Sequence, residues 1–120
     1  MKNDVQIKVT CITNENKKDE FHFDYYDKEG IIVGTIAVDE IGRLGWEVWN
    51  DEYQGNILEA VSFIFGNKVT NPMENVMEAK NPDEMRWDRA QEYIEKRGYL
   101  VNYLQNPKFN EVFENGSMKK

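Results

Sequence analysis

The first half of the chain alternates apolar and polar residues with a period of two, and this pattern constrains the fold more than any other feature. Val5, Ile7 and Val9 alternate with Gln6 and Lys8, as side chains do on a strand with one buried face. Short polar or glycine-containing turns separate four such segments, and connections this short favour antiparallel pairing of successive strands. The predicted strands, which form a four-stranded antiparallel meander, are residues 5–12, 20–26, 31–38 and 44–49.

The second half of the chain changes to the spacing of helices. Ile57, Val61 and Ile64 recur as neighbours on one helical face do. Each of the three prolines follows an asparagine, a pair that suits a helix start because asparagine caps free N–H groups and proline loses no donor there. The predicted helices are residues 56–65, 72–79, 82–97 and 107–114, and 99–105 remains open between helix and extended chain. The fold class is therefore α+β.

The size and composition of the chain favour one domain that needs no cross-links. A chain of 120 residues has the commonest length of a single domain, which we place at 1–116, with a frayed tail at 117–120. One cysteine, Cys11, and one histidine, His22, exclude an internal disulfide and a multi-histidine metal site. No apolar run is long enough to cross a membrane. We expect a cytoplasmic protein.

The negative charge lies in the first half. The formal net charge is −7; residues 1–60 hold 13 acidic and 6 basic residues, and residues 61–120 hold 9 of each. A negative field repels phosphate backbones and speeds encounter with a basic partner. Direct nucleic-acid binding is therefore disfavoured, and a protein with a basic surface, such as a nuclease or toxin, is the favoured partner. Acidity that serves solubility alone is the alternative.

No arrangement of residues predicts catalysis, metal binding or a bound cofactor. Cys11 and His22 have opposite strand parity, so they do not form a nucleophile and its base. Asp4 and the tripeptide Glu15-Asn16-Lys17 are similar to the acidic pattern of metal-dependent nucleases, but the tripeptide falls in a predicted loop. The glycines lie in hairpins and form no phosphate-binding loop. We therefore expect a protein that is not an enzyme.

The predicted helix 82–97 carries three stripes of side chains. Trp87, Ala90 and Ile94 form its apolar face, and cations around Tyr93 form a basic stripe. Such a stripe suits a phosphorylated or nucleotide ligand, or it is simply a solvated helix face with intrahelical ion pairs. The candidate ligand-binding residues are Arg86, Arg89, Tyr93 and Arg97.

The two tryptophans of the fourth predicted strand indicate a second buried surface. Trp46 and Trp49 have opposite parity, so one of them faces away from the first core. Either the later helices cover both faces of the sheet, or one face meets another chain, including a second copy of this one.

Two hypotheses for function follow. The first is a non-enzymatic inhibitor, of the immunity-protein or phage anti-defence type, that occupies a basic surface of its partner. Its predicted partner-binding residues are Asp24, Tyr26, Asp27, Glu29, Asp39, Glu40, Glu47 and Trp49. The alternative is an oligomeric protein that captures a phosphorylated or nucleotide ligand through the basic stripe.

Overall fold

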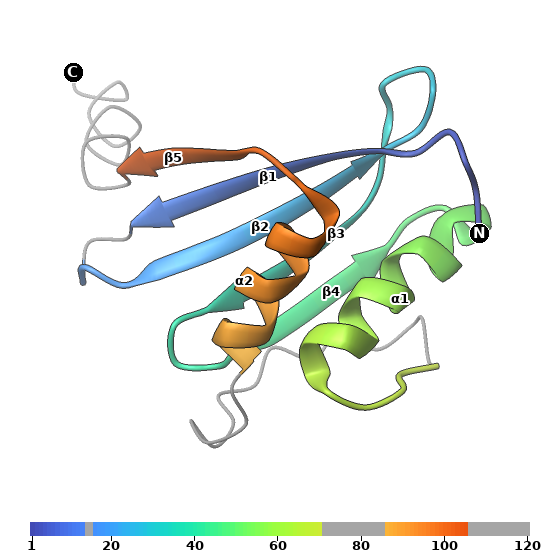
Figure 1. Ribbon diagram of the computed structural model, residues 1–120. Coiled ribbons are helices and arrows are strands. Elements are labelled where there is room, and N and C mark those ends of the chain that lie inside the picture. The colour runs from blue at the N-terminus through green and yellow to red at the C-terminus, as the bar shows by residue number, and fades with distance from the viewer. Residues whose placement is uncertain (14–15, 71–85, 106–120) are drawn as a thin grey trace.

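A five-stranded sheet and two helices make up the described part of the fold. The computed structural model describes residues 1–13, 16–70 and 86–105 (Figure 1). In chain order the elements are β1 (Gln6–Thr13), β2 (Asp19–Tyr26), β3 (Ile32–Asp39), β4 (Leu44–Val48), the 3₁₀ turn η1 (Asp51–Tyr53), α1 (Gln54–Phe65), α2 (Arg86–Arg97) and β5 (Val101–Gln105). The α+β class and the four predicted strands are confirmed, and no strand end differs from its predicted position by more than one residue.

The sheet has the strand order β4-β3-β2-β1-β5. Strands β1 to β4 form the predicted antiparallel meander, in which Val9 pairs with Phe23 and Phe23 pairs with Ile36. The prediction of four strands was too few, because β5 pairs with β1 in parallel and extends the sheet by one edge. A strand of five residues leaves little sequence pattern, and its partner β1 is nearly ninety residues away in the chain.

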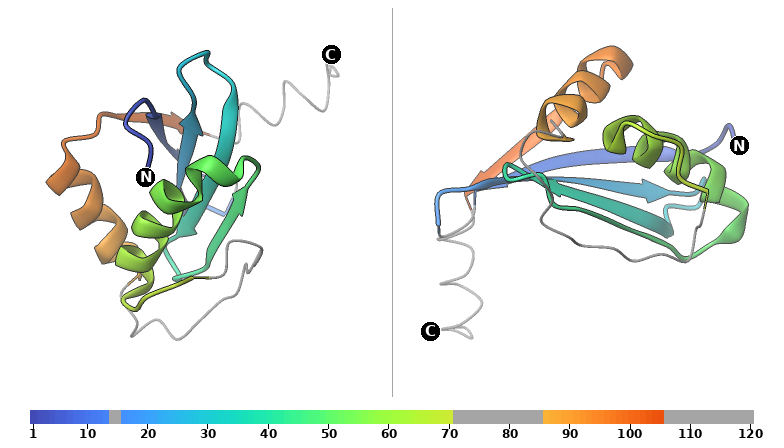
Figure 2. Two further views of the ribbon diagram at one scale, coloured as in Figure 1. Left: turned by 90° about the vertical axis from the view of Figure 1, so that its right-hand side faces the viewer. Right: turned by 90° about the horizontal axis from the view of Figure 1, so that it is seen from below.

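Both described helices pack on the same face of the sheet (Figures 1 and 2). Strand alternation directs one set of apolar side chains under these helices, where Phe23, Tyr25, Ile36 and Ile57 are fully buried. The opposite face, which we call the outer face, carries the alternate residues of each strand. The described helices α1 and α2 do not cover both faces of the sheet, because both leave the outer face uncovered. Contact of one face with another chain stays a prediction.

Helix α1 begins two residues before its predicted start and ends where predicted. The Asn50 side chain accepts a hydrogen bond from the Glu52 N–H and starts the 3₁₀ turn that leads into the helix. Ile57, Val61 and Ile64 are fully buried on its inner face, as their spacing predicted. Gly66 ends the helix in the left-handed conformation at φ 87°.

Helix α2 ends at Arg97, as predicted, and Gly98 follows with φ 69°. Ala90 and Ile94 of the predicted apolar stripe are buried, and Trp87 stacks on Phe21 with ring centroids 4.5 Å apart. Arg86 and Tyr93, expected on the basic stripe, are buried as well. The buried face of α2 is therefore wider than its apolar residues indicated, because long side chains of the basic stripe also pack against α1.

Several predicted segments lie outside the described residues. These are the helices at 72–79 and 107–114, the first four residues of the helix predicted at 82–97, and the tail at 117–120. Within the described residues, no helix is both long enough and apolar enough to span a membrane.

A close approach between α1 and β3 sets the first prediction. A Cβ atom on Gly34 would collide with Ile57 Cδ1 and would lie 2.7 Å from the Glu47 carbonyl oxygen. Gly34→Ala is expected to lower the free energy of unfolding by about 1–3 kcal/mol, because the added methyl overpacks the contact. Urea denaturation measures the change.

Gly55→Ala is the matched control. Its Cβ would meet only Met1, at 3.1 Å from the flexible side chain's Cγ and at 3.8 Å or more from the backbone, and alanine favours a helix. We expect no loss, or a gain of up to about 1 kcal/mol. Equal losses in the two variants would mean that the Gly34–Ile57 contact does not limit stability.

Candidate functional site

Six of the eight predicted partner-binding residues meet at one end of the sheet. This end holds the β2–β3 turn and the last residues of β4 (Figure 1). Strand pairing sets Asp24 beside Thr35 and Thr35 beside Glu47 on the outer face, and alternation carries Trp49 to the same side. We call this surface the hairpin patch, and it comprises Asp24, Tyr26, Asp27, Glu29, Ile31, Ile32, Glu47 and Trp49.

The centre of the hairpin patch is apolar. Trp49 is 53 % exposed, and Ile31 and Ile32 are 61 % and 40 % exposed. Tyr26 pairs with Ile32 across the β2–β3 ladder, and the Lys8 ammonium lies 5.0 Å from the Tyr26 ring centroid. Large exposed apolar side chains gathered at one place are typical of interaction surfaces.

The carboxylates of the hairpin patch differ in what they do inside the fold. Asp27 Oδ1 accepts hydrogen bonds from the Glu29 and Ile31 N–H groups, both at 2.9 Å, and so shapes the turn. Asp24 Oδ1 accepts a bond of 2.8 Å from the Thr35 hydroxyl. Glu29 is exposed and Glu47 is half-buried. The patch is therefore acidic, and Lys8 and Lys28 offset only part of its charge.

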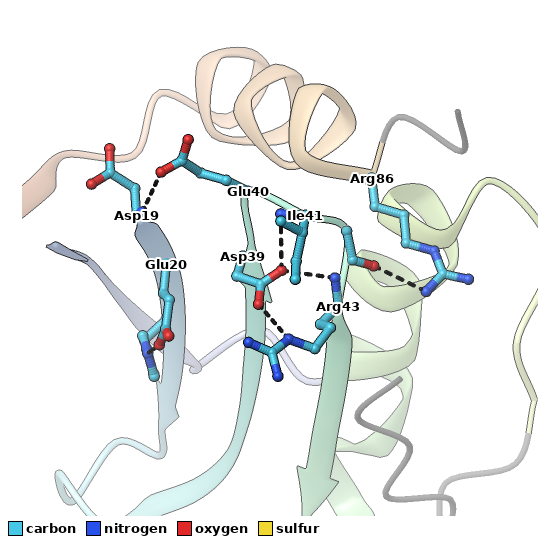
Figure 3. Close-up of polar contacts among 9 residues, drawn as sticks. Asp19, Glu20, Asp39, Glu40, Ile41, Arg43 and Arg86 are labelled. Atoms are coloured by element: carbon cyan, nitrogen blue, oxygen red, sulfur yellow. Dashed lines mark hydrogen bonds and ion pairs between the residues drawn. The ribbon is translucent and has the colours of Figure 1, made fainter. Parts of the chain in front are cut away.

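The other two predicted partner-binding residues, Asp39 and Glu40, lie at the opposite end of the sheet (Figure 3). Asp39 Oδ1 accepts from the Ile41 and Arg43 N–H groups at 3.2 and 2.8 Å, and Oδ2 accepts from Arg43 Nε at 2.7 Å. Glu40 accepts a short hydrogen bond from the Asp19 N–H. These two carboxylates hold the β3–β4 turn, and the structure does not bring them to the hairpin patch.

Cys11 and His22 lie on opposite faces of the sheet, as their parity predicted. Cys11 is buried beside Phe21, whereas His22 pairs with Thr10 on the outer face and contacts Glu20 Oε1 at 3.2 Å. Burial, with the nearby negative charges of Asp19 and Glu40, raises the pKa of the Cys11 thiol to about 11. At neutral pH this thiol is protonated and a poor nucleophile.

No metal centre appears in the part of the chain that the structure describes. Among those residues, no group of three or more histidine, cysteine, aspartate or glutamate side chains is placed to hold a metal ion. Glu15, the second acid of the nuclease-like pattern, is outside the described residues.

The predicted basic stripe of α2 divides into two parts, and the first part holds the helices together. Arg89 Nε donates to the Phe63 carbonyl, and its guanidinium lies 4.7 Å from the Phe63 ring centroid. Arg86 is buried, donates to the Gly42 carbonyl at 3.3 Å and lies 4.4 Å from the Phe65 ring centroid (Figure 3). Both cations lie at the carbonyl end of α1, where the helix dipole favours positive charge.

The second part of the stripe, Tyr93 and Arg97, borders a cavity of about 360 Å³ between the helices and the N-terminal segment. Arg97 forms an ion pair with Glu59 of α1, and the Tyr93 hydroxyl donates to Glu59 at 3.5 Å. Tyr25 and Tyr99 also line the cavity. Sequence reasoning missed Tyr25, Glu59 and Tyr99; inward parity marked Tyr25, but nothing local indicates that Glu59 faces Arg97.

Burial raises the pKa of all three tyrosines at this cavity. Desolvation is the largest cause of the raised pKa of Tyr25, and the charges of ionised Tyr93, Tyr99 and Glu59 raise it further. Desolvation is also the largest cause for Tyr93 and for Tyr99. The hydroxyls therefore stay neutral in the folded protein at pH values where an exposed tyrosine ionises.

The role of Arg89 in joining the helices yields a mutational prediction. Arg89→Ala removes a charge-assisted hydrogen bond and a cation–π contact, and is expected to lower the free energy of unfolding by about 1–3 kcal/mol. Gln91→Ala, at an exposed position of α2, should change it by less than about 0.5 kcal/mol, because an exposed side chain on a helix surface contributes little to stability. Urea denaturation of both variants checks this, and similar losses would contradict the assignment.

The tyrosine pKa shifts predict a loss of stability in alkali. The unfolded chain ionises near the ordinary tyrosine pKa of 10.0, while the folded protein keeps the protons. The tyrosine contribution to stability is thus full below pH 10 and is lost as the pH rises toward the folded pKa values. Unfolding measured from about pH 8 to about pH 11 should show this decline, and Tyr25→Phe should make it shallower. An unchanged slope in Tyr25→Phe would refute the role of Tyr25.

Comparison of the chain with protein-family models, with curated proteins and with solved structures found no match. Its function is therefore inferred from the geometry of the described residues.

Proposed function

We propose that the protein is a small, non-enzymatic binding protein that occupies a basic surface of another protein through the hairpin patch. The observation that carries this proposal is the gathering of Asp24, Asp27, Glu29 and Glu47 around Tyr26 and Trp49 at one end of the outer face. These residues come from β2, from the β2–β3 turn and from the end of β4, so their proximity is a property of the folded sheet.

The composition of the patch suits a protein partner. An apolar centre that a partner excludes from water supplies affinity, and aromatic residues at such centres dominate binding energy. Trp49 is the large exposed side chain at this centre, and burying it would make it the anchor. The surrounding carboxylates would speed encounter with a positive surface and reject negative ones.

A partner that handles nucleic acid fits this chemistry, because its binding channel must itself be basic. A nuclease or a toxin of that kind would lose access to its substrate when an acidic domain covers the channel. The protein would then act as an inhibitor, of the immunity or anti-defence type, by occupancy alone. A reducing cytoplasm suits it, since its buried Cys11 is a free thiol.

The test compares partner capture by surface variants. Glu29→Lys with Glu47→Lys, and separately Trp49→Ala, are chosen because Asp24 and Asp27 accept internal hydrogen bonds and are avoided. Tagged proteins are used to capture partners from host lysate, and the bound protein is identified and its affinity measured by titration. We expect a basic protein whose affinity falls by at least about tenfold in either variant.

Glu92→Lys with Glu95→Lys on α2 is the matched control, because it makes the same change in net charge on the other face of the molecule. Capture that the control abolishes equally would reduce the effect to net charge and contradict the proposal. A dimer of the protein that Trp49→Ala dissociates would also contradict it, because the patch would then bind a second copy.

A further inference from the structure

Strand β5 is an edge of the sheet, and among the described residues only β1 pairs with it (Figure 1). The free edge of such a strand presents backbone N–H and C=O groups that can pair with a strand of another chain. Natural proteins protect exposed edges with charged residues, prolines or bulges. The pairing of β5 with β1 runs in unbroken register over Val101–Gln105, and the strand contains neither a charge nor a proline. Its own sequence therefore leaves this edge unprotected.

The absence of charge at this edge extends over two strands. Residues 98–107 form the longest stretch without a charged residue, in a sequence of which 31 % is charged. The residues of β1 that pair with β5, Val9 to Thr13, are uncharged as well. Strand β4, at the other edge of the sheet, carries Glu47 instead. The β5 edge therefore differs in composition from the rest of the molecule.

Burial does not account for this absence of charge. Tyr103 and Leu104 of β5 are 71 % and 48 % exposed, and Leu100, just before the strand, is 92 % exposed. Tyr103 lies on the same face of the sheet as its ladder partner Cys11, which is buried. The described helices therefore cover Cys11 and leave Tyr103 uncovered. Exposed apolar side chains beside an open strand edge are typical of an interface.

An uncharged strand suits a second copy of itself better than a basic partner. When two identical strands pair in antiparallel around a twofold axis, each residue near the axis faces its own copy or a close neighbour. A charged residue there would face a like charge, which destabilises the pair. A surface that recognises a basic protein carries the complementary charge, as the hairpin patch does, and β5 carries none.

We propose that two copies of the chain pair in antiparallel through their β5 strands, so that their sheets become one continuous sheet. With the strands in register, Tyr103, the middle residue of β5, faces its own copy, and Asn102 faces Leu104 of the second copy. Aromatic side chains that face each other across neighbouring strands stabilise a sheet. The proposal does not rest on partner binding by the hairpin patch.

This arrangement leaves both hairpin patches free. Strand β5 pairs with residues 9–13 of β1, whereas the patch lies near the other end of β1, where Gln6 pairs with Tyr26. The carboxylates of the patch belong to β2, the β2–β3 turn and β4, which β1 separates from β5. The acidic surfaces of two copies therefore stay apart, and a dimer presents two patches to partners.

Analytical ultracentrifugation of the intact protein measures its mass as a function of concentration. We expect the mass to rise from that of one chain toward that of two between about 10 μM and about 1 mM, because pairing through one strand buries a small area. Tyr103→Lys should raise the dissociation constant at least about tenfold, since the two new charges face each other across the axis. Gln91→Lys, which adds the same charge at an exposed position of α2, should leave it unchanged.

Amide hydrogen exchange of the unmodified protein gives a second measurement, which does not depend on how a variant folds. Protection of the β5 amides should increase with protein concentration, because pairing engages the N–H groups of the free edge. The amides of β4, the other edge strand, should show no such increase.

Three results would overturn the proposal. The first is a monomer at about 1 mM, whether its β5 edge is exposed or covered by residues of the same chain. The second is a dimer in which the β5 amides gain no protection. The third is equal weakening by Tyr103→Lys and Gln91→Lys, which would reduce the effect to net charge. Trp49→Ala should leave the β5 dimer intact while it weakens partner capture, so the two proposals fail independently.

Discussion

Burial of one face of the sheet under α1 and α2 is the constraint on which the rest of the structure depends. Because side chains alternate along a strand, placing Phe23 and Tyr25 beneath the helices forces Asp24 and Tyr26 to the outer face. The same register aligns Thr35 and Glu47 beside them. The same strand register therefore determines both the core and the acidic surface. A register shift of one residue would move the core side chains to the outer face and the acidic ones to the inner face.

Two arginines make a large part of the contact between α1 and α2. Arg86 and Arg89 cover the Phe65 and Phe63 rings and donate to backbone carbonyls. Their methylene groups pack against apolar side chains, while their guanidinium groups interact favourably with the negative end of the α1 dipole. At the other end of α2, Arg97 meets Glu59 instead, and the helices leave the cavity between them and the N-terminal segment. The same face of α2 therefore covers the core and lines the cavity.

The hairpin patch and the cavity lie on opposite faces of the same sheet, one step of the strand alternation apart. Tyr26 belongs to the patch, and Tyr25 lines the cavity. The pairing of β2 with β3 changes register between these two residues. A β-bulge here increases local twist and redirects the neighbouring side chains. Two consecutive residues of β2 therefore belong to the two surfaces.

Local pattern in the sequence determined the four antiparallel strands, the end of α1 at Gly66, the end of α2 before Gly98 and the opposite faces of Cys11 and His22, since each depends on neighbours along the chain. Only the tertiary structure decided the pairing of β5 with β1, the burial of Arg86 and Tyr93, and the separation of Asp39 and Glu40 from the other acidic residues. It also decided that Glu59 meets Arg97 and that Tyr25 reaches a cavity. These features join residues far apart in the chain, and the order of residues along a chain does not state which distant side chains will pack together.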